Sequence, residues 1–175
     1  MPSRHAWGGD YELTAEDAAE FMVFWDAFKR AEQRSVVDAA LRRFSYAADR
    51  HRTDDRLVDL AICAETLFLG GSDSPQDRGE LRYRFSLRAA SFIDIDATKR
   101  ETFRFMRNTY DARSAIVHGG SPESEVLCSL GGERVELEVF TDAVEGVLRL
   151  ALRKAVTLNG PRRGPLLDWD ELILG

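Results

Sequence analysis

The chain has little of what stabilises proteins outside a packed core or anchors them in a membrane. Its 175 residues include two cysteines, Cys63 and Cys128, which allow no disulfide framework and form no metal-binding pattern. No apolar run approaches the ~20 residues that span a bilayer, and residues 1–5 lack the apolar stretch of a signal peptide. These absences favour a cytoplasmic protein with reduced thiols and no membrane partner. Cys63, inside an apolar segment, is expected in the core.

Net positive charge is also lacking. The chain has 24 Lys and Arg residues against 30 Asp and Glu residues, which gives a net charge of -6. Proteins that bind nucleic acid over a broad surface are normally basic, so the composition excludes that class. A small basic cleft remains compatible, because a local field can oppose the overall charge. An RNA-binding function must therefore depend on a focused site.

The chain does contain a series of amphipathic segments of helical period. Apolar side chains recur at spacings of three and four residues, as on one face of an α-helix. The expected helices begin near Thr14, Ser35, Thr53, Ser74, Asp94 or Asp96, and residues 138 and 167. The sequence thus predicts an all-α, up-and-down bundle of about five to seven helices. An alternating pattern in residues 134–137 indicates a short strand or hairpin near residues 126–137.

The hydropathy of each segment, and the residues that begin and end it, predict how the chain is organised within this bundle. Residues 57–69 are apolar almost all round, so their helix is expected at the centre of the bundle. Residues 1–34 are interpreted as a helical lead-in that packs on the bundle. Residues 35–158 form the main helical domain, and residues 159–175 form a tail with a short helix. No repeat, low-complexity segment or linker separates them.

The densest group of chemically useful side chains lies late in the fifth expected helix. Arg113, Ser114 and His118 follow the spacing R-S-x-x-x-H, directly before Gly119 and Gly120. Histidine as a residue type can take and give a proton near neutral pH, and the arginine fork suits a phosphate. On a regular helix, five residues turn by about 500°, which leaves the two side chains about 140° apart.

Arg113 and His118 can therefore meet only if the helix changes pitch or ends there, or if two copies of the chain build the site. The alternative is that His118 favours the negative end of the helix dipole and Arg113 makes an ion pair.

Glu65 is the second unusual position, because it is a carboxylate in the middle of an apolar helix. Its expected partner is Arg113, Arg88 or Arg84. The pair would either orient Arg113 within a site or lock two helices together. Tyr110, one turn before Arg113, would either hydrogen-bond within the site or pack.

A run of arginines and aromatic residues in the fourth expected helix is a candidate RNA-binding strip. Arg84 and Arg88, with Arg82, Tyr83 and Phe85, could contact a nucleic-acid strand. The alternative is a solvated helix face with extended arginines.

The R-S-x-x-x-H spacing, late in a helical bundle, resembles the R-x(4–6)-H motif of the HEPN superfamily. Residues 57–68, 85–90 and 110–119 also resemble the Apea-like HEPN group in order and spacing, over roughly residues 35–158. One departure is Ser114, at a position where nucleases of the superfamily often carry Asn, Asp or His.

The resemblance implies a metal-independent endoribonuclease without a cofactor, in a bacterial antiviral defence or toxin-like system. Its partners would be RNA, a second copy across the Arg113–His118 face, and a neutralising or regulatory protein. Arg113 would stabilise charge on the scissile phosphate, and His118 would act as general base or acid. Two alternatives remain: a non-catalytic HEPN-like module that binds RNA, nucleotide or a protein, and a structural dimerisation domain.

Overall fold

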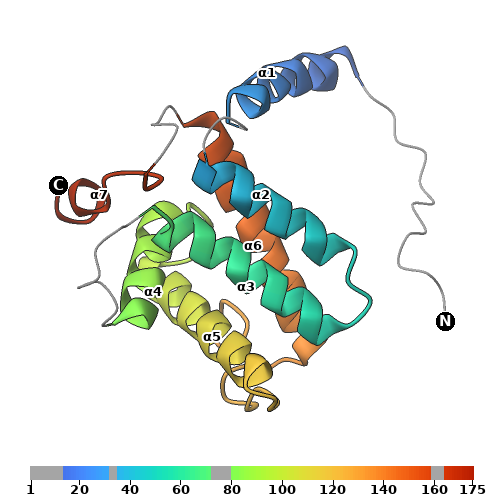
Figure 1. Ribbon diagram of the computed structural model, residues 1–175, viewed down its shortest axis with the longest axis vertical. Coiled ribbons are helices and arrows are strands. Elements are labelled where there is room, and N and C mark those ends of the chain that lie inside the picture. The colour runs from blue at the N-terminus through green and yellow to red at the C-terminus, as the bar shows by residue number, and fades with distance from the viewer. Residues whose placement is uncertain (1–13, 32–34, 72–79, 159–163) are drawn as a thin grey trace.

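The part of the polypeptide that the structure describes consists of helices and the segments that connect them. The computed structural model describes residues 14–31, 35–71, 80–158 and 164–175. Within these ranges lie the helices α1 (Ala15–Ala31), α2 (Ser35–Ala48), α3 (Thr53–Leu69), α4 (Leu81–Phe92), α5 (Lys99–Val117), α6 (Leu137–Thr157) and α7 (Trp169–Leu174), and no strand (Figure 1). The predicted all-α bundle is confirmed. None of the described helices has both the length and the hydropathy of a bilayer-spanning segment.

Side-chain caps determine where α1 and α5 begin, and Asp168 caps α7 in the same way. The Thr14 side chain accepts a hydrogen bond from the Asp17 N–H (3.1 Å), and Asp17 accepts one from the Thr14 N–H (3.0 Å), so α1 begins as predicted. Helix α5 begins at Lys99, three residues beyond Asp96, the later of the two predicted caps. Thr98 caps it instead and forms a reciprocal box with Glu101 (2.8 and 3.2 Å). Two backbone donors are satisfied there, which explains the later start.

Helix α3 is the centre of the bundle, as its all-round apolar pattern predicts. It contacts α2, α4, α5 and α6. Cys63 is fully buried within it, and burial raises the pKa of the Cys63 thiol to about 12, so the thiol is protonated at neutral pH. At the end of α3, the Phe68 ring makes edge contacts with Phe85, Phe92 and Trp169. This aromatic group joins α3, α4 and α7.

Two charged clusters fix α3 against its neighbours. Arg56, only 11% exposed, donates hydrogen bonds to Asp142 (2.6 Å) and to Glu145 on α6. Asp59 on α3 is buried and accepts a hydrogen bond from Arg50 (2.6 Å), just beyond α2. Charge-assisted bonds of this kind add geometric specificity to apolar packing. They hold α3, and with it Glu65, in a defined position.

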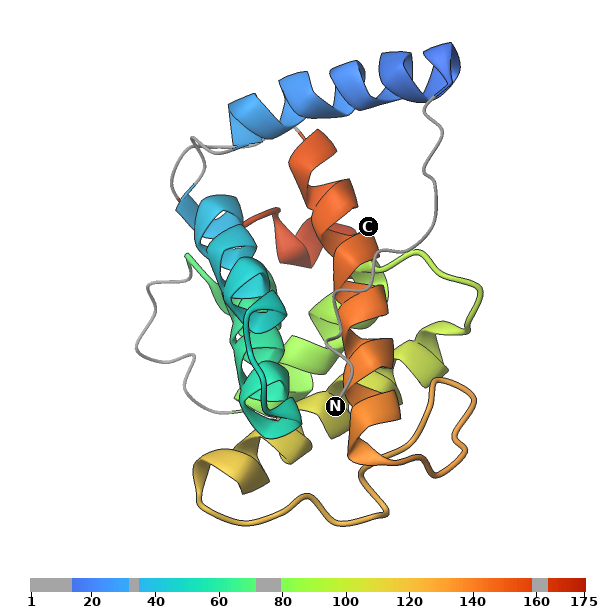
Figure 2. The ribbon, with the colours of Figure 1, turned by 90° about the vertical axis from the view of Figure 1, so that its right-hand side faces the viewer.

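The remaining helices cover the ends of the bundle. Helix α1 lies across one end, where it contacts α6 and leaves Phe21 and Trp25 exposed (Figure 2). Helix α7 packs against α4. The predicted helix start at Ser74 lies outside the described residues, as do residues 1–13 of the predicted lead-in and residues 159–163 of the predicted tail.

The predicted hairpin near residues 126–137 is a turn without strands in the described chain. A single antiparallel bridge joins Cys128 to Arg134, and the Ser129 N–H donates to the Glu133 carbonyl (2.8 Å). The chain then enters α6 at Leu137. The alternation in residues 134–137 therefore reflects one bridge and the first residue of a helix.

Candidate functional site

Helix α5 remains regular up to its end at Val117. The His118 N–H donates to the Ser114 carbonyl (3.1 Å), and the N–H groups of Gly119 and Gly120 donate to carbonyls of the preceding turn, both at 2.9 Å. Gly119 adopts a φ of +81°, which favours glycine. This bonding pattern is a Schellman motif, and it ends the helix directly after the histidine.

The regular helix keeps Arg113 and His118 apart within one chain. No change of pitch occurs between them, so the helical period places their side chains about 140° apart. His118 has a φ of -84°, near the helical value, whereas its ψ of 11° leaves the helical range. Because ψ changes only the direction of the residues that follow, the Cβ of His118 stays where the helix places it. A single chain with this backbone therefore keeps the two side chains on different sides of α5.

Arg113 instead contacts Glu65 on the central helix. Its Nη2 lies 3.5 Å from Glu65 Oε2, and the side chains are 27% and 23% exposed. Glu65 Oε1 and Arg113 Nε are buried without a hydrogen-bond partner in the described structure. Burial raises the pKa of Glu65, and the positive charge of Arg113 opposes that rise. The pair is loose and incompletely satisfied, so it retains capacity for a further polar partner.

Two other predicted site residues lie on α5 near this pair. The Tyr110 ring packs against the buried Phe85 ring, with centroids 5.8 Å apart, as expected from the packing alternative. Ser114 is half-buried, and its carbonyl accepts the hydrogen bond from His118. These contacts support the geometry of the helix end.

The predicted substrate-binding arginines on α4 are engaged elsewhere. Arg88 donates to the Phe68 carbonyl (3.0 Å), and its guanidinium lies 5.3 Å from the centre of the Trp169 ring. It thus ties α4 to the end of α3 and to α7. Arg84 is half-buried on the same helix, and Phe85 is fully buried in the core. Phe85 packs in the core and Arg88 contacts the Phe68 carbonyl and the Trp169 ring, so these two residues do not form an exposed strip.

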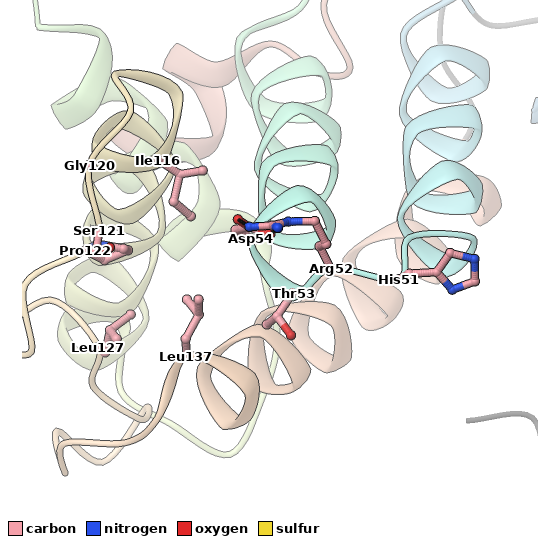
Figure 3. A pocket seen from close by; sticks show the side chains of 10 residues that line it. All are labelled: His51, Arg52, Thr53, Asp54, Ile116, Gly120, Ser121, Pro122, Leu127 and Leu137. Carbon is pink, nitrogen blue, oxygen red and sulfur yellow. Dashed lines mark hydrogen bonds and ion pairs between the residues drawn. The ribbon is translucent and has the colours of Figure 1, made fainter. Parts of the chain in front are cut away.

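A pocket of about 530 Å³ lies beside the end of α5 (Figure 3). Ile116 and residues 120–122 line one side, and residues 51–54, at the start of α3, line the other. Arg52 within it donates two hydrogen bonds to Asp54 (3.0 and 2.6 Å), so its charge is already compensated. Sequence reasoning missed this pocket because it joins two connecting segments that are distant in the chain.

In the ranges that the structure describes, no three His, Cys, Asp or Glu side chains gather closely enough to hold a metal ion. Comparison of the chain with protein-family models, with curated proteins and with solved structures gave no match.

Proposed function

We propose that this protein is a metal-independent endoribonuclease whose active site forms between two copies of the chain. Arg113 of one copy and His118 of the other would meet at the scissile phosphate. The single observation that carries the proposal is the end of α5, where an exposed histidine and a loosely paired arginine lie five residues apart on different sides of a regular helix. The resemblance of this segment to the HEPN motif supports the same reading.

The reaction follows from the chemistry of the two side chains. His118 takes the proton from the ribose 2'-hydroxyl, whose oxygen then bonds to phosphorus. Arg113 stabilises the charge that builds up on the phosphoryl oxygens. The bond to the 5'-oxygen breaks, and His118 returns the proton to that leaving oxygen. The products are a 2',3'-cyclic phosphate and a 5'-hydroxyl.

A second candidate function is a non-catalytic module that binds RNA, nucleotide or a protein partner. One observation favours it: Arg113 faces Glu65 of its own chain, so its charge is partly compensated before any phosphate arrives. Such a module would lose affinity when Arg113 is replaced and would cleave no RNA.

The deciding experiment is cleavage of a mixed pool of single-stranded and structured RNA in excess EDTA. We expect cyclic-phosphate products from the wild type and none from His118→Ala. His51→Ala is the matched control, because His51 is also exposed but lies in the connection before α3. Equal cleavage by wild type and His118→Ala would contradict the proposal. RNA binding without cleavage by the wild type would favour the non-catalytic module.

A further inference from the structure

Helix α5 carries an excess of positive charge in a chain whose net charge is -6. It holds five cationic side chains and two carboxylates. Arg100, Arg104 and Arg107 are exposed, and among the described residues no ion pair joins them to a carboxylate. This group, the α5 arginine face, is the kind of focused basic surface that an acidic protein needs for binding a polyanion.

The α5 arginine face is aligned with His118 along the helix. Arg100, Arg104 and Arg107 precede His118 by 18, 14 and 11 residues, each close to a whole number of turns. The rise of an α-helix places them about 27, 21 and 17 Å from the histidine. The three guanidinium groups therefore mark a line that leads to the proposed catalytic side chain.

A pocket of about 310 Å³ lies against this face. Arg104, Arg107 and Asn108 line one wall, and residues 128–132 of the turn before α6 line the other. Glu101 and Glu125 also line the pocket. Gly132 in that turn has a φ of +89°. Arginine donors opposite a short glycine turn make a hollow in which a phosphate can approach both side chains and backbone.

The carboxylates near the line are engaged with other groups. Glu101 closes the capping box at the start of α5, and Glu125 pairs with Arg134 (3.2 Å). Asp111 accepts a hydrogen bond from Arg82, which brings a fourth guanidinium to the same face. The capping box leaves the carboxylate of Glu101 charged, and that charge acts on Arg104. With Arg82 and Arg134, five guanidinium groups nevertheless stand against the three carboxylates of Glu101, Asp111 and Glu125, so positive charge is in excess along this side of α5.

We propose that the α5 arginine face and the turn at residues 128–132 bind the sugar-phosphate backbone of single-stranded RNA and lead it to His118. This inference rests on the proposed nuclease function and specifies its substrate. A single strand fits better than a duplex because one line of guanidinium groups matches one flexible backbone. Because the chain is acidic overall, its positive charge is limited to a narrow line, which suits one strand better than two.

The test measures RNA binding separately from cleavage, in the His118→Ala background. The probe is a fluorescein-labelled single-stranded RNA of about 20 nucleotides, longer than a typical single-strand site. Replacing Arg104 and Arg107 together by Gln should weaken binding about tenfold and reduce the slope of log affinity against log salt by about 1.4, the value for two lost phosphate contacts. The matched control replaces Arg30 and Arg153, exposed arginines on α1 and α6, by Gln.

Each outcome decides between the proposals. The proposal for the α5 arginine face would be overturned by any of three results. These are an unchanged affinity in the Arg104/Arg107 variant, an equal loss of affinity in the control variant, and no RNA binding at all. If a polyglutamate peptide displaces the labelled RNA as well as unlabelled RNA does, the α5 arginine face binds acidic proteins instead. If RNA binds through Arg104 and Arg107 but the wild type does not cleave it, the nuclease function fails and the RNA-binding face stands. If the Arg104/Arg107 replacement in an otherwise wild-type protein leaves cleavage unaffected, the nuclease function stands and the α5 arginine face is ruled out.

Discussion

At the scale of single residues, the pairing of Glu65 with Arg113 is the feature that sequence reasoning anticipated best. An unpartnered carboxylate in an apolar helix requires a cation, and only three arginines of the predicted neighbouring helices were candidates. The sequence could not choose among them, because the choice depends on how α4 and α5 pack on α3. The structure assigns Arg113 to Glu65 and places Arg88 against the Phe68 carbonyl and the Trp169 ring.

Replacing Glu65 by Gln should stabilise the fold slightly at neutral pH. The folded state raises the pKa of Glu65 above its ordinary value of 4.5, so the folded protein holds the proton more tightly than the unfolded chain. The corresponding stability is fully present below pH 4.5 and is lost as pH rises through the raised pKa. Glu65→Gln cannot ionise and avoids that loss.

Urea unfolding between about pH 4 and pH 8 tests this prediction. The stability advantage of Glu65→Gln should be absent at the acidic end and should grow as pH rises. A variant that is less stable than the wild type at neutral pH would show instead that the ion pair with Arg113 stabilises the fold overall.

At the scale of elements, the helices were predictable, and their boundaries were predictable where the caps are local. Thr14 with Asp17 determines the start of α1 from four adjacent residues. The start of α5 was placed too early because aspartate is also a good cap, and the reciprocal box with Glu101 favours Thr98. The turn at residues 126–136 is harder to predict from the sequence. A single bridge gives almost the same alternation of polar and apolar residues as a strand.

Two glycine replacements should change stability in opposite directions. A Cβ at Gly119 or at Gly146 would meet no atom within 4 Å, so neither replacement causes a steric clash with neighbouring residues. Gly119 has a φ of +81°, so Gly119→Ala should lower the free energy of unfolding by about 1 kcal/mol. Gly146 lies within the helix α6, so Gly146→Ala should raise it by about 0.5–1 kcal/mol.

Chemical denaturation of both variants beside the wild type tests this pair. A neutral Gly119→Ala would mean that the Schellman end of α5 adapts easily, and the position of His118 would then not depend on it.

At the scale of the whole molecule, the proposed two-chain site predicts complementation between inactive variants. Arg113→Ala and His118→Ala should each be inactive alone. After subunit exchange, half of the dimers combine the two variants, and one of their two sites carries an intact Arg113 and an intact His118. Cleavage should therefore recover to roughly a quarter of the wild-type rate.

The measurement is the rate of RNA cleavage before and after mixing, with the dimer fraction followed by analytical ultracentrifugation. No recovery in a mixture that does exchange subunits would place both residues in a site within one chain. A monomer at micromolar concentration would remove the two-chain site altogether.

The aromatic group around Phe68 has a consequence for the order in which the chain can complete its fold. Trp169 contacts both Phe68 and Phe92, although about a hundred residues separate it from Phe68 in the sequence. During synthesis, α3 and α4 emerge from the ribosome long before Trp169 does. Until Trp169 has been made, its ring does not cover the aromatic rings of α3 and α4 on that side. The nascent chain then exposes an apolar surface that is prone to aggregation. Folding of the centre of the bundle is therefore completed by a residue that is synthesised about a hundred residues after Phe68.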